Sequence, residues 1–132
     1  MSNDAAPAVA GTPRLLLRLE GAALTAIAVV LYAKAGASWW LFAVLVLAPD
    51  LSFLGYLAGP RIGAAAYNAA HTTLGPIGLA LVGLWAPASP SIAIALIWLT
   101  HIGADRLLGY GLKYGAGFAF THLGRIGRTS DR

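Results

Sequence analysis

Four apolar stretches, each about as long as a bilayer is thick, constrain what this chain can fold into. A membrane-spanning α-helix needs roughly 20 predominantly apolar residues. The stretches run from about Leu15 to Ala33, Trp39 to Ala58, Ile62 to Trp85 and Ser91 to Leu108. Proline and glycine clusters, which stop helices, separate them. We therefore predict an all-α, polytopic membrane protein with three parts: a disordered N-terminal tail over 1–13, a four-transmembrane-helix bundle over 14–108, and a basic, glycine-rich cytoplasmic tail over 109–132.

Composition supports the bilayer as the solvent for this chain. Of 132 residues, 58% are hydrophobic and 11% are charged, whereas about a quarter of a soluble domain is charged. The net charge of +4 does not indicate nucleic acid, because the basic residues sit at the ends of apolar stretches. The chain has no cysteine, which excludes disulfides and thiolate chemistry. The expected partner is the lipid bilayer.

The distribution of basic residues predicts the orientation in the membrane. Of the nine Lys and Arg residues, only Lys34 falls on one predicted side. The others share the opposite side: Arg14, Arg18, Arg61, Arg106, Lys113, Arg125, Arg128 and Arg132. Positive charge is retained on the cytoplasmic side. We therefore predict cytoplasmic N and C termini.

A cleaved signal peptide over Arg14 to Ala35 is the alternative reading of the first stretch. Two arginines precede the apolar run there, and it ends in the small-x-small pattern Ala33-Lys34-Ala35. Against this reading, the polar region before the run is long, and Glu20 interrupts the start of the apolar segment.

Polar residues inside the stretches fall at similar predicted depths. At about 1.5 Å per residue from the cytoplasmic ends, Asp50 lies about 12 Å deep, His71 about 13 Å and His101 about 10 Å. On the same scale, Glu20 and Asn68 lie about 9 Å deep and Asp105 about 5 Å. Polar groups in a membrane face the bundle interior, pair, or mark a functional path. Helices of alternating direction thus bring these groups to one level in the cytoplasmic half.

Helical spacing and two prolines strengthen the prediction of a polar site. His101 and Asp105 are separated by one helical turn and share a face, as Asn68 and His71 do. Pro49 and Pro76 each remove a backbone donor within a predicted span. The carbonyls freed in this way must be met by neighbouring groups or water, which suits a polar cavity.

The first hypothesis for the site is a metal centre. Asp50, His71, His101 and Asp105 would supply imidazole and carboxylate ligands for zinc, iron or manganese, with an open position to activate water. Glu20 would then act as a general base. Asn68 and Arg106 are further polar residues near the site, although Arg106 is expected to cap its span at the headgroups.

Two other hypotheses use the same residues. In a small transporter, the histidines would form a proton or cation relay. Four helices are few for a transporter, and Gly55-x-x-x-Gly59 offers a packing face for a homo-oligomer or for two helices of one subunit. In a purely structural protein, the polar groups would only bond helices to one another.

Several short motifs, in this order, resemble a known bacterial membrane family. They are Leu17-Arg18-Leu19-Glu20-Gly21, Ala48-Pro49-Asp50-Leu51-Ser52, Tyr67-Asn68 with His71-Thr72, His101 to Arg106, Gly109 to Tyr114, and Thr121 to Gly124. Together they are similar to the family called domain of unknown function 4260, from about Leu15 to Gly127. The resemblance implies a multi-pass protein of the bacterial inner membrane and no particular activity.

A looser similarity concerns bacterial membrane-bound metal-dependent hydrolases. In that group, one helix carries His followed by Thr or Ser, and a later helix carries His with Asp several residues on. His71-Thr72 and His101-x-x-x-Asp105 fit this outline. The similarity implies a divalent metal and a hydrolytic reaction.

Overall fold

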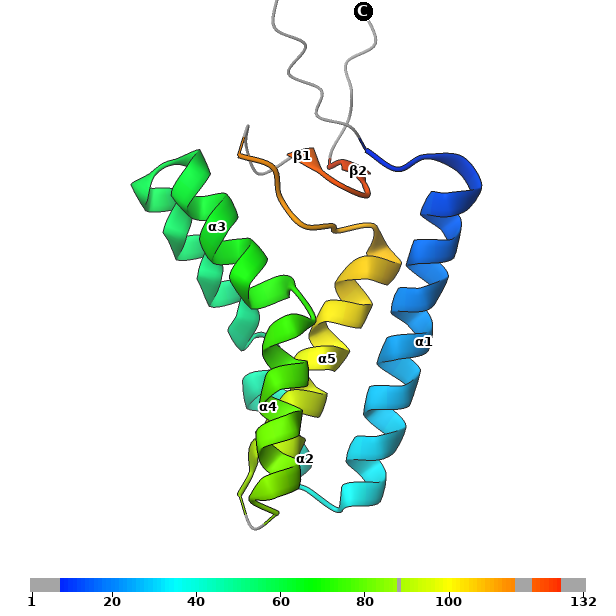
Figure 1. Cartoon of the computed structure of the whole chain (residues 1–132), viewed down its shortest axis with the longest axis vertical. Coiled ribbons are helices and arrows are strands. Elements are labelled where there is room, and N and C mark those ends of the chain that lie inside the picture. The colour runs from blue at the N-terminus through cyan, green and yellow to red at the C-terminus, as the bar shows by residue number, and fades with distance from the viewer. Residues whose placement is uncertain (1–7, 88, 116–119, 127–132) are drawn as a thin grey trace, which may run out of the picture.

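The computed structural model describes residues 8–87, 89–115 and 120–126 and is almost entirely helical. Five α-helices, one 3₁₀ helix and a minimal hairpin follow in the order α1 (Gly11–Ala35), α2 (Trp39–Leu45), η1 (Ala48–Ala58), α3 (Pro60–His71), α4 (Leu74–Trp85), α5 (Ser91–Leu108), β1 (Phe120–Thr121) and β2 (Gly124–Arg125). Figure 1 shows α1, α4 and α5 running along the long axis, while α3 leans away from them.

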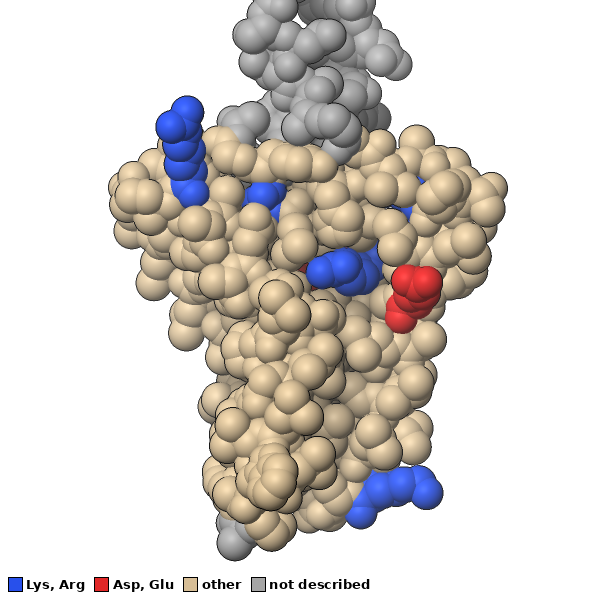
Figure 2. Space-filling model, in the orientation of Figure 1, with Lys and Arg blue, Asp and Glu red and all other residues tan. Residues whose placement is uncertain are grey.

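Three segments of the described chain are long and apolar enough to cross a membrane. They are α1, the α2–η1 segment Trp39–Ala58, and α5. Their outward faces carry large exposed apolar side chains such as Ile27, Val44 and Leu54. Exposed apolar surface on this scale indicates a membrane protein. On the face shown in Figure 2, charged side chains gather in the half that carries the β-hairpin, a basic side chain lies at the opposite end, and the surface between them is uncharged.

The predicted third span is not one helix. The chain breaks after α3, where Thr72 adopts an extended conformation (φ −80°, ψ 146°), and α4 starts at Leu74. Pro76 lies in the first turn of α4. Backbone N–H groups in a first turn have no acceptor within the helix, so a proline there costs no helical hydrogen bond. The expectation of one continuous helix from Ile62 to Trp85 is therefore wrong, because the proline is accommodated by starting a new helix.

The second span is also interrupted. Helix α2 ends at Leu45, and the chain continues as the tighter 3₁₀ helix η1, with Pro49 in its first turn. The Asp50 N–H donates to the Leu47 carbonyl at 3.0 Å, the shorter 3₁₀ connection. The Val46 carbonyl consequently loses its α-helical donor and is available to a side chain.

Helices α1 and α5 cross where two glycines meet. A Cβ on Gly103 would lie 2.7 Å from the Gly21 carbonyl oxygen and 2.8 Å from the Thr25 nitrogen. Small residues of this kind let helix backbones approach closely in membranes. Further along the same pair, Ala28, Tyr32, Leu96 and Ile97 form the apolar core. The glycine contact sets how closely α5 lies against α1.

The chain after α5 folds back over one end of the bundle. We call its described part, residues 109–115 and 120–126, the C-terminal cap. Gly109 ends α5 in the left-handed conformation (φ 85°), Leu123 is fully buried, and Val9 donates to the His122 carbonyl at 2.8 Å. Both described ends of the chain thus lie at the same end of the molecule (Figure 1). The C-terminal cap, which was expected to be a tail on the membrane surface, thus covers this end of the bundle. Residues 127–132 lie outside the described part of the chain.

The N-terminal boundary also differs from the sequence-based expectation. Helix α1 begins at Gly11, so the last residues of the predicted tail over 1–13 are helical. Residues 1–7 of that tail lie outside the described part of the chain.

We predict that Gly103→Ala weakens the fold, because the added methyl group would meet the α1 backbone. Overpacking of this kind costs about 1–3 kcal/mol. Thermal unfolding in detergent, followed by circular dichroism, should show a lower midpoint. The control is Gly78→Ala on α4, where an added Cβ meets nothing within 4 Å. Equal midpoints for the two variants would contradict the close crossing.

Candidate metal centre

Four side chains from three elements converge at one point in the half of the molecule beneath the C-terminal cap. Asp50 comes from η1, His71 from the end of α3, and His101 and Asp105 from successive turns of α5. One ligand atom from each lies within 4.8 Å of the others. We call these four residues the His/Asp cluster. The convergence expected from depth and helical spacing is present in the structure.

The distances within the cluster have the scale of a metal coordination shell. The two imidazole Nε2 atoms lie 3.1 Å apart. Nε2 of His71 is 3.3 Å from one oxygen of each aspartate, and Nε2 of His101 is 3.1 Å from Asp50 and 3.3 Å from Asp105. Ligands at about 2.0–2.1 Å around a tetrahedral cation lie roughly 3.3 Å from one another. The distances between the histidines, and from each histidine to both aspartates, match that spacing.

Backbone carbonyls fix the tautomers of both histidines. Nδ1 of His71 lies 2.8 Å from the Tyr67 carbonyl oxygen, and Nδ1 of His101 lies 2.6 Å from the Val46 carbonyl oxygen. A carbonyl oxygen can only accept, so each Nδ1 carries the proton. In the neutral rings both Nε2 atoms are therefore lone-pair acceptors directed into the cluster. Histidines that bind metals are held by the same kind of outer hydrogen bond.

The breaks in the helices create these outer hydrogen bonds. The Val46 carbonyl is free for His101 because the chain tightens into a 3₁₀ helix at Pro49. His71 is the last residue of α3, so its own carbonyl leaves the helix and accepts from Arg106 at 3.4 Å. The Ala70 carbonyl accepts from the indole N–H of Trp98 at 2.5 Å. Side chains of α5 thus satisfy the carbonyls exposed by both breaks.

Burial is uneven across the cluster. The side chains of His71 and His101 are 4% and 5% exposed, whereas Asp105 is 17% and Asp50 45% exposed. A cavity of 280 Å³ adjoins the two aspartates and is otherwise lined by Phe53, Tyr67, Tyr110 and Ile126. The cluster is therefore closed on its imidazole side and open on its carboxylate side, where a small molecule has access.

Tyr67 and Lys113 extend the site on the side of the C-terminal cap. The Tyr67 ring stacks on the His71 imidazole, with 3.7 Å between centroids and 5° between planes, and its hydroxyl donates to Asp105 at 3.4 Å. The ammonium of Lys113 lies 4.7 Å from the centroid of the same tyrosine ring. Burial lowers the pKa of Lys113 to about 8, partly offset by the negative charge of Asp105. Tyr67 thus lines the open side of the cluster, and the buried Lys113 lies against the face of its ring.

Asn68 binds backbone and does not join the cluster. Its amide nitrogen donates to the Lys113 carbonyl at 2.7 Å, and its oxygen accepts from the Lys113 N–H at 2.5 Å. These two bonds hold the C-terminal cap on α3. From its position along the helix, Asn68 was predicted to lie near the site, but its side chain contacts the C-terminal cap.

Glu20 and Arg106 lie beside a different cavity. Together with residues of α1, Thr73 and Ile102, they line a space of 150 Å³ on the α1 side of α5. Glu20 is exposed there, and the four residues whose ligand atoms converge do not include it. The structure therefore does not bring the predicted general base to the cluster, and Arg106 contributes through the His71 carbonyl.

Sequence reasoning did not identify Tyr67 and Lys113 as part of the site. Tyr67 lies one helical turn before His71, a spacing that does put two residues on one face. Nothing local marks Lys113, because its place depends on how the cap folds back. The signal for Tyr67 was present, and that for Lys113 was not.

Comparison with known proteins gives one match. A family model described as a domain of unknown function (DUF4260) matches residues 14–126. Among characterised protein sequences and among solved structures, no significant match is found. The match covers all six helices of the described chain except the first turn of α1, and it includes every residue of the His/Asp cluster.

We predict that Asn68→Ala releases the C-terminal cap. It leaves the backbone N–H and carbonyl of buried Lys113 without the amide partners described above, at a cost of about 1–3 kcal/mol. Hydrogen–deuterium exchange should then be faster in residues 110–115. Asn68→Asp keeps an acceptor for the Lys113 N–H and should give an intermediate rate. If residues 110–115 exchange as slowly in Asn68→Ala as in the wild type, the Asn68 amide does not hold the C-terminal cap in place.

Proposed function

The chain belongs to the DUF4260 family, whose description names no activity, and from the site itself we propose that it is a metal-dependent membrane hydrolase. In this proposal, Asp50, His71, His101 and Asp105 hold one divalent cation. The observation that carries it is that the two Nε2 atoms lie 3.1 Å apart and each lies 3.1–3.3 Å from one oxygen of both aspartates, with all four atoms within 4.8 Å of one another. With Nδ1 protonated and both rings neutral, these four atoms are all acceptors, and a cation at their centre would hold them together.

Charge balance within the membrane favours a divalent cation. Two carboxylates carry two negative charges, and uncompensated charge near the bilayer centre costs at least about 2.5 kcal/mol. A divalent cation neutralises both carboxylates in one step. The nearly buried imidazoles then need no protons of their own on Nε2. The proposed site is thus neutral overall and suited to its depth.

The donor set limits which metal fits. Two imidazole nitrogens with two carboxylate oxygens suit zinc, iron or manganese. Bound water on such a cation is deprotonated near neutral pH and can attack a carbonyl or phosphoryl group. Hydrolysis would join the water oxygen to the carbonyl or phosphoryl atom and break that atom's bond to the leaving group, which would take up a proton of the water; Asp50, the most exposed member of the cluster, is placed to pass that proton on. The similarity of His71-Thr72 and His101-x-x-x-Asp105 to membrane-bound metal-dependent hydrolases agrees with this reaction class.

In the proposed topology, both termini lie in the cytoplasm of a bacterial cell, and the protein is a multi-pass protein of the inner membrane. Helices α1, α2–η1 and α5 cross the bilayer, and α3 and α4 together form a broken fourth crossing. The positions of the basic residues support this orientation. The cluster then lies in the cytoplasmic half, and its open side faces the C-terminal cap.

A proton relay is the second candidate, and the contact between the two histidines favours it. Their Nε2 atoms lie 3.1 Å apart, the distance at which a shared proton would bond both rings. A relay across the membrane also needs a polar path to the other side. Toward that side, α1 and α5 pack Ala28, Tyr32, Leu96 and Ile97 into an apolar core. This packing supports a site that works from one side.

We predict that the protein, purified in detergent without chelator, contains about one equivalent of zinc, iron or manganese per chain. His101→Ala and Asp105→Asn should lose it, because each removes one of four ligands. Elemental analysis checks the content. A thermal shift gives a second readout, since saturating metal at a hundredfold excess over Kd adds about 2.7 kcal/mol to the stability of a competent site.

Two matched controls accompany this experiment. His122→Ala removes the one histidine outside the cluster, and Glu20→Gln removes a carboxylate at the neighbouring cavity. Both should keep the metal. Wild-type protein that stays metal-free after incubation with each of the three ions would overturn the proposal, and proton flux in vesicles would then test the relay.

The topology is tested with the cysteine-free chain as background. We predict that a membrane-impermeant maleimide labels Ala35→Cys, at the end of α1, in intact cells. Ala58→Cys, at the end of η1, should react only after permeabilisation. Both alanines are exposed and next to a turn. The reverse pattern would contradict the proposed orientation, and external labelling of both would contradict a crossing by α2–η1.

A further inference from the structure

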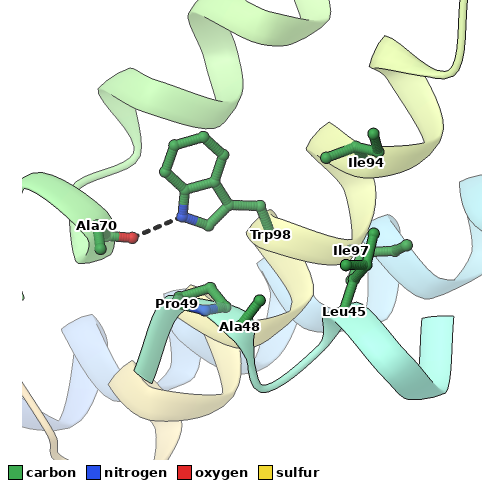
Figure 3. Close-up of a pocket in the computed structure, with 7 residues that line it drawn as sticks. All are labelled: Leu45, Ala48, Pro49, Ala70, Ile94, Ile97 and Trp98. Atoms are coloured by element: carbon green, nitrogen blue, oxygen red, sulfur yellow. Dashed lines mark hydrogen bonds between the residues drawn. The ribbon is translucent and has the colours of Figure 1, made fainter. Parts of the chain in front are cut away.

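An apolar groove, separate from the open cavity, lies beside the His/Asp cluster. It has a volume of 220 Å³ and is lined by Leu45, Ala48, Pro49, Ala70, Ile94, Ile97 and Trp98. Figure 3 shows Trp98 reaching from α5 toward Ala70 at the end of α3. The indole N–H of Trp98 is already bonded to the Ala70 carbonyl. The groove wall therefore presents hydrocarbon to whatever lies in it.

The groove and the cluster share the same stretches of backbone. Pro49 precedes Asp50 in η1, and Ala70 precedes His71 in α3. On α5, Ile97 lies one helical turn before His101. The wall of the groove is therefore continuous with the backbone that carries Asp50 and His71, since adjacent Cα atoms are about 3.8 Å apart.

The environment of the groove determines what fills it. All but one of its lining residues are only partly buried, so the groove is open to the side. Leu47, the neighbour of Ala48 in the chain, is 66% exposed and belongs to the lipid-facing surface. Water does not occupy apolar cavities, and one of about 150 Å³ stays dry and binds benzene. In a bilayer, the apolar groups that reach a lateral opening are acyl chains.

We propose that this groove, the acyl groove, seats one hydrocarbon chain of a bilayer lipid, and that the substrate of the site is an acyl amphiphile whose polar group lies at Asp50, the exposed carboxylate of the cluster that follows Pro49 of the groove wall. The substrate class rests on the proposed hydrolase function, whereas occupancy of the groove does not. The amphiphile enters from the membrane, and water reaches the scissile bond from the cavity beside Asp50 and Asp105.

The test uses a phosphatidylcholine with a diazirine on one acyl chain, in vesicles that contain the wild-type protein or a variant. After irradiation, mass spectrometry maps the adducts. We expect them to concentrate in residues 45–49 and 94–98, above the level at Leu54 and Leu84, which are 65% and 68% exposed. Ala48→Phe fills the groove and should lower these adducts severalfold.

Control variants keep the result interpretable. Ala65→Phe adds the same ring at an exposed position of α3 outside the groove and should leave the adducts unchanged. Should Ala48→Phe not fold, Ile94→Phe fills the groove from α5. Groove labelling no stronger than at Leu54 and Leu84, or unaffected by the filling variant, would overturn the acyl groove.

Metal content, measured on the same samples, separates this proposal from the hydrolase function. Groove labelling in metal-free protein would leave the acyl groove standing and remove the substrate assignment together with the hydrolase. Bound metal without groove labelling would leave the metal centre standing and remove the acyl amphiphile.

Discussion

Backbone carbonyls that leave a helix inside hydrocarbon must be bonded within the protein, and this requirement organises the whole site. The chain breaks twice, after α2 and after α3. Side chains of α5 meet the exposed carbonyls: His101 bonds Val46, Trp98 bonds Ala70, and Arg106 approaches His71. Helix α5 is itself held close to α1 by the contact of Gly21 with Gly103. Helix α5 therefore supplies hydrogen-bond donors at both breaks.

The same breaks account for the chemistry of the cluster. The bond from Nδ1 of His101 to the Val46 carbonyl turns its Nε2 lone pair toward Nε2 of His71. An unbroken second span would keep the Val46 carbonyl within its own helix, and the imidazole would lose its orientation. The breaks also separate a polar side, bordered by Asp50 and Asp105, from an apolar side at Pro49 and Ala70. An amphiphilic molecule matches that arrangement.

Particular residues show how far the sequence could predict the site. Depth and spacing placed Asp50, His71, His101 and Asp105 together, because helix rise converts sequence position into height. The same reasoning placed Glu20 at that height, but it fixes no rotation about the helix axis, and Glu20 faces a different cavity. Helix rise also could not predict the form of the two breaks, one between α2 and η1 and one between α3 and α4. A proline removes a backbone donor, but it does not determine whether the chain kinks, tightens into a 3₁₀ helix or starts a new helix.

The sequence by itself determined which segments are apolar enough to cross a membrane and which four residues form the cluster, because hydropathy and helix rise are local properties. Only the tertiary structure decided that the third segment is two helices, that Asn68 holds the C-terminal cap, and that Tyr67 and Lys113 border the cluster. Each of these depends on which distant group meets an exposed backbone atom or ring. Such partners are chosen by packing between helices, which no single segment encodes.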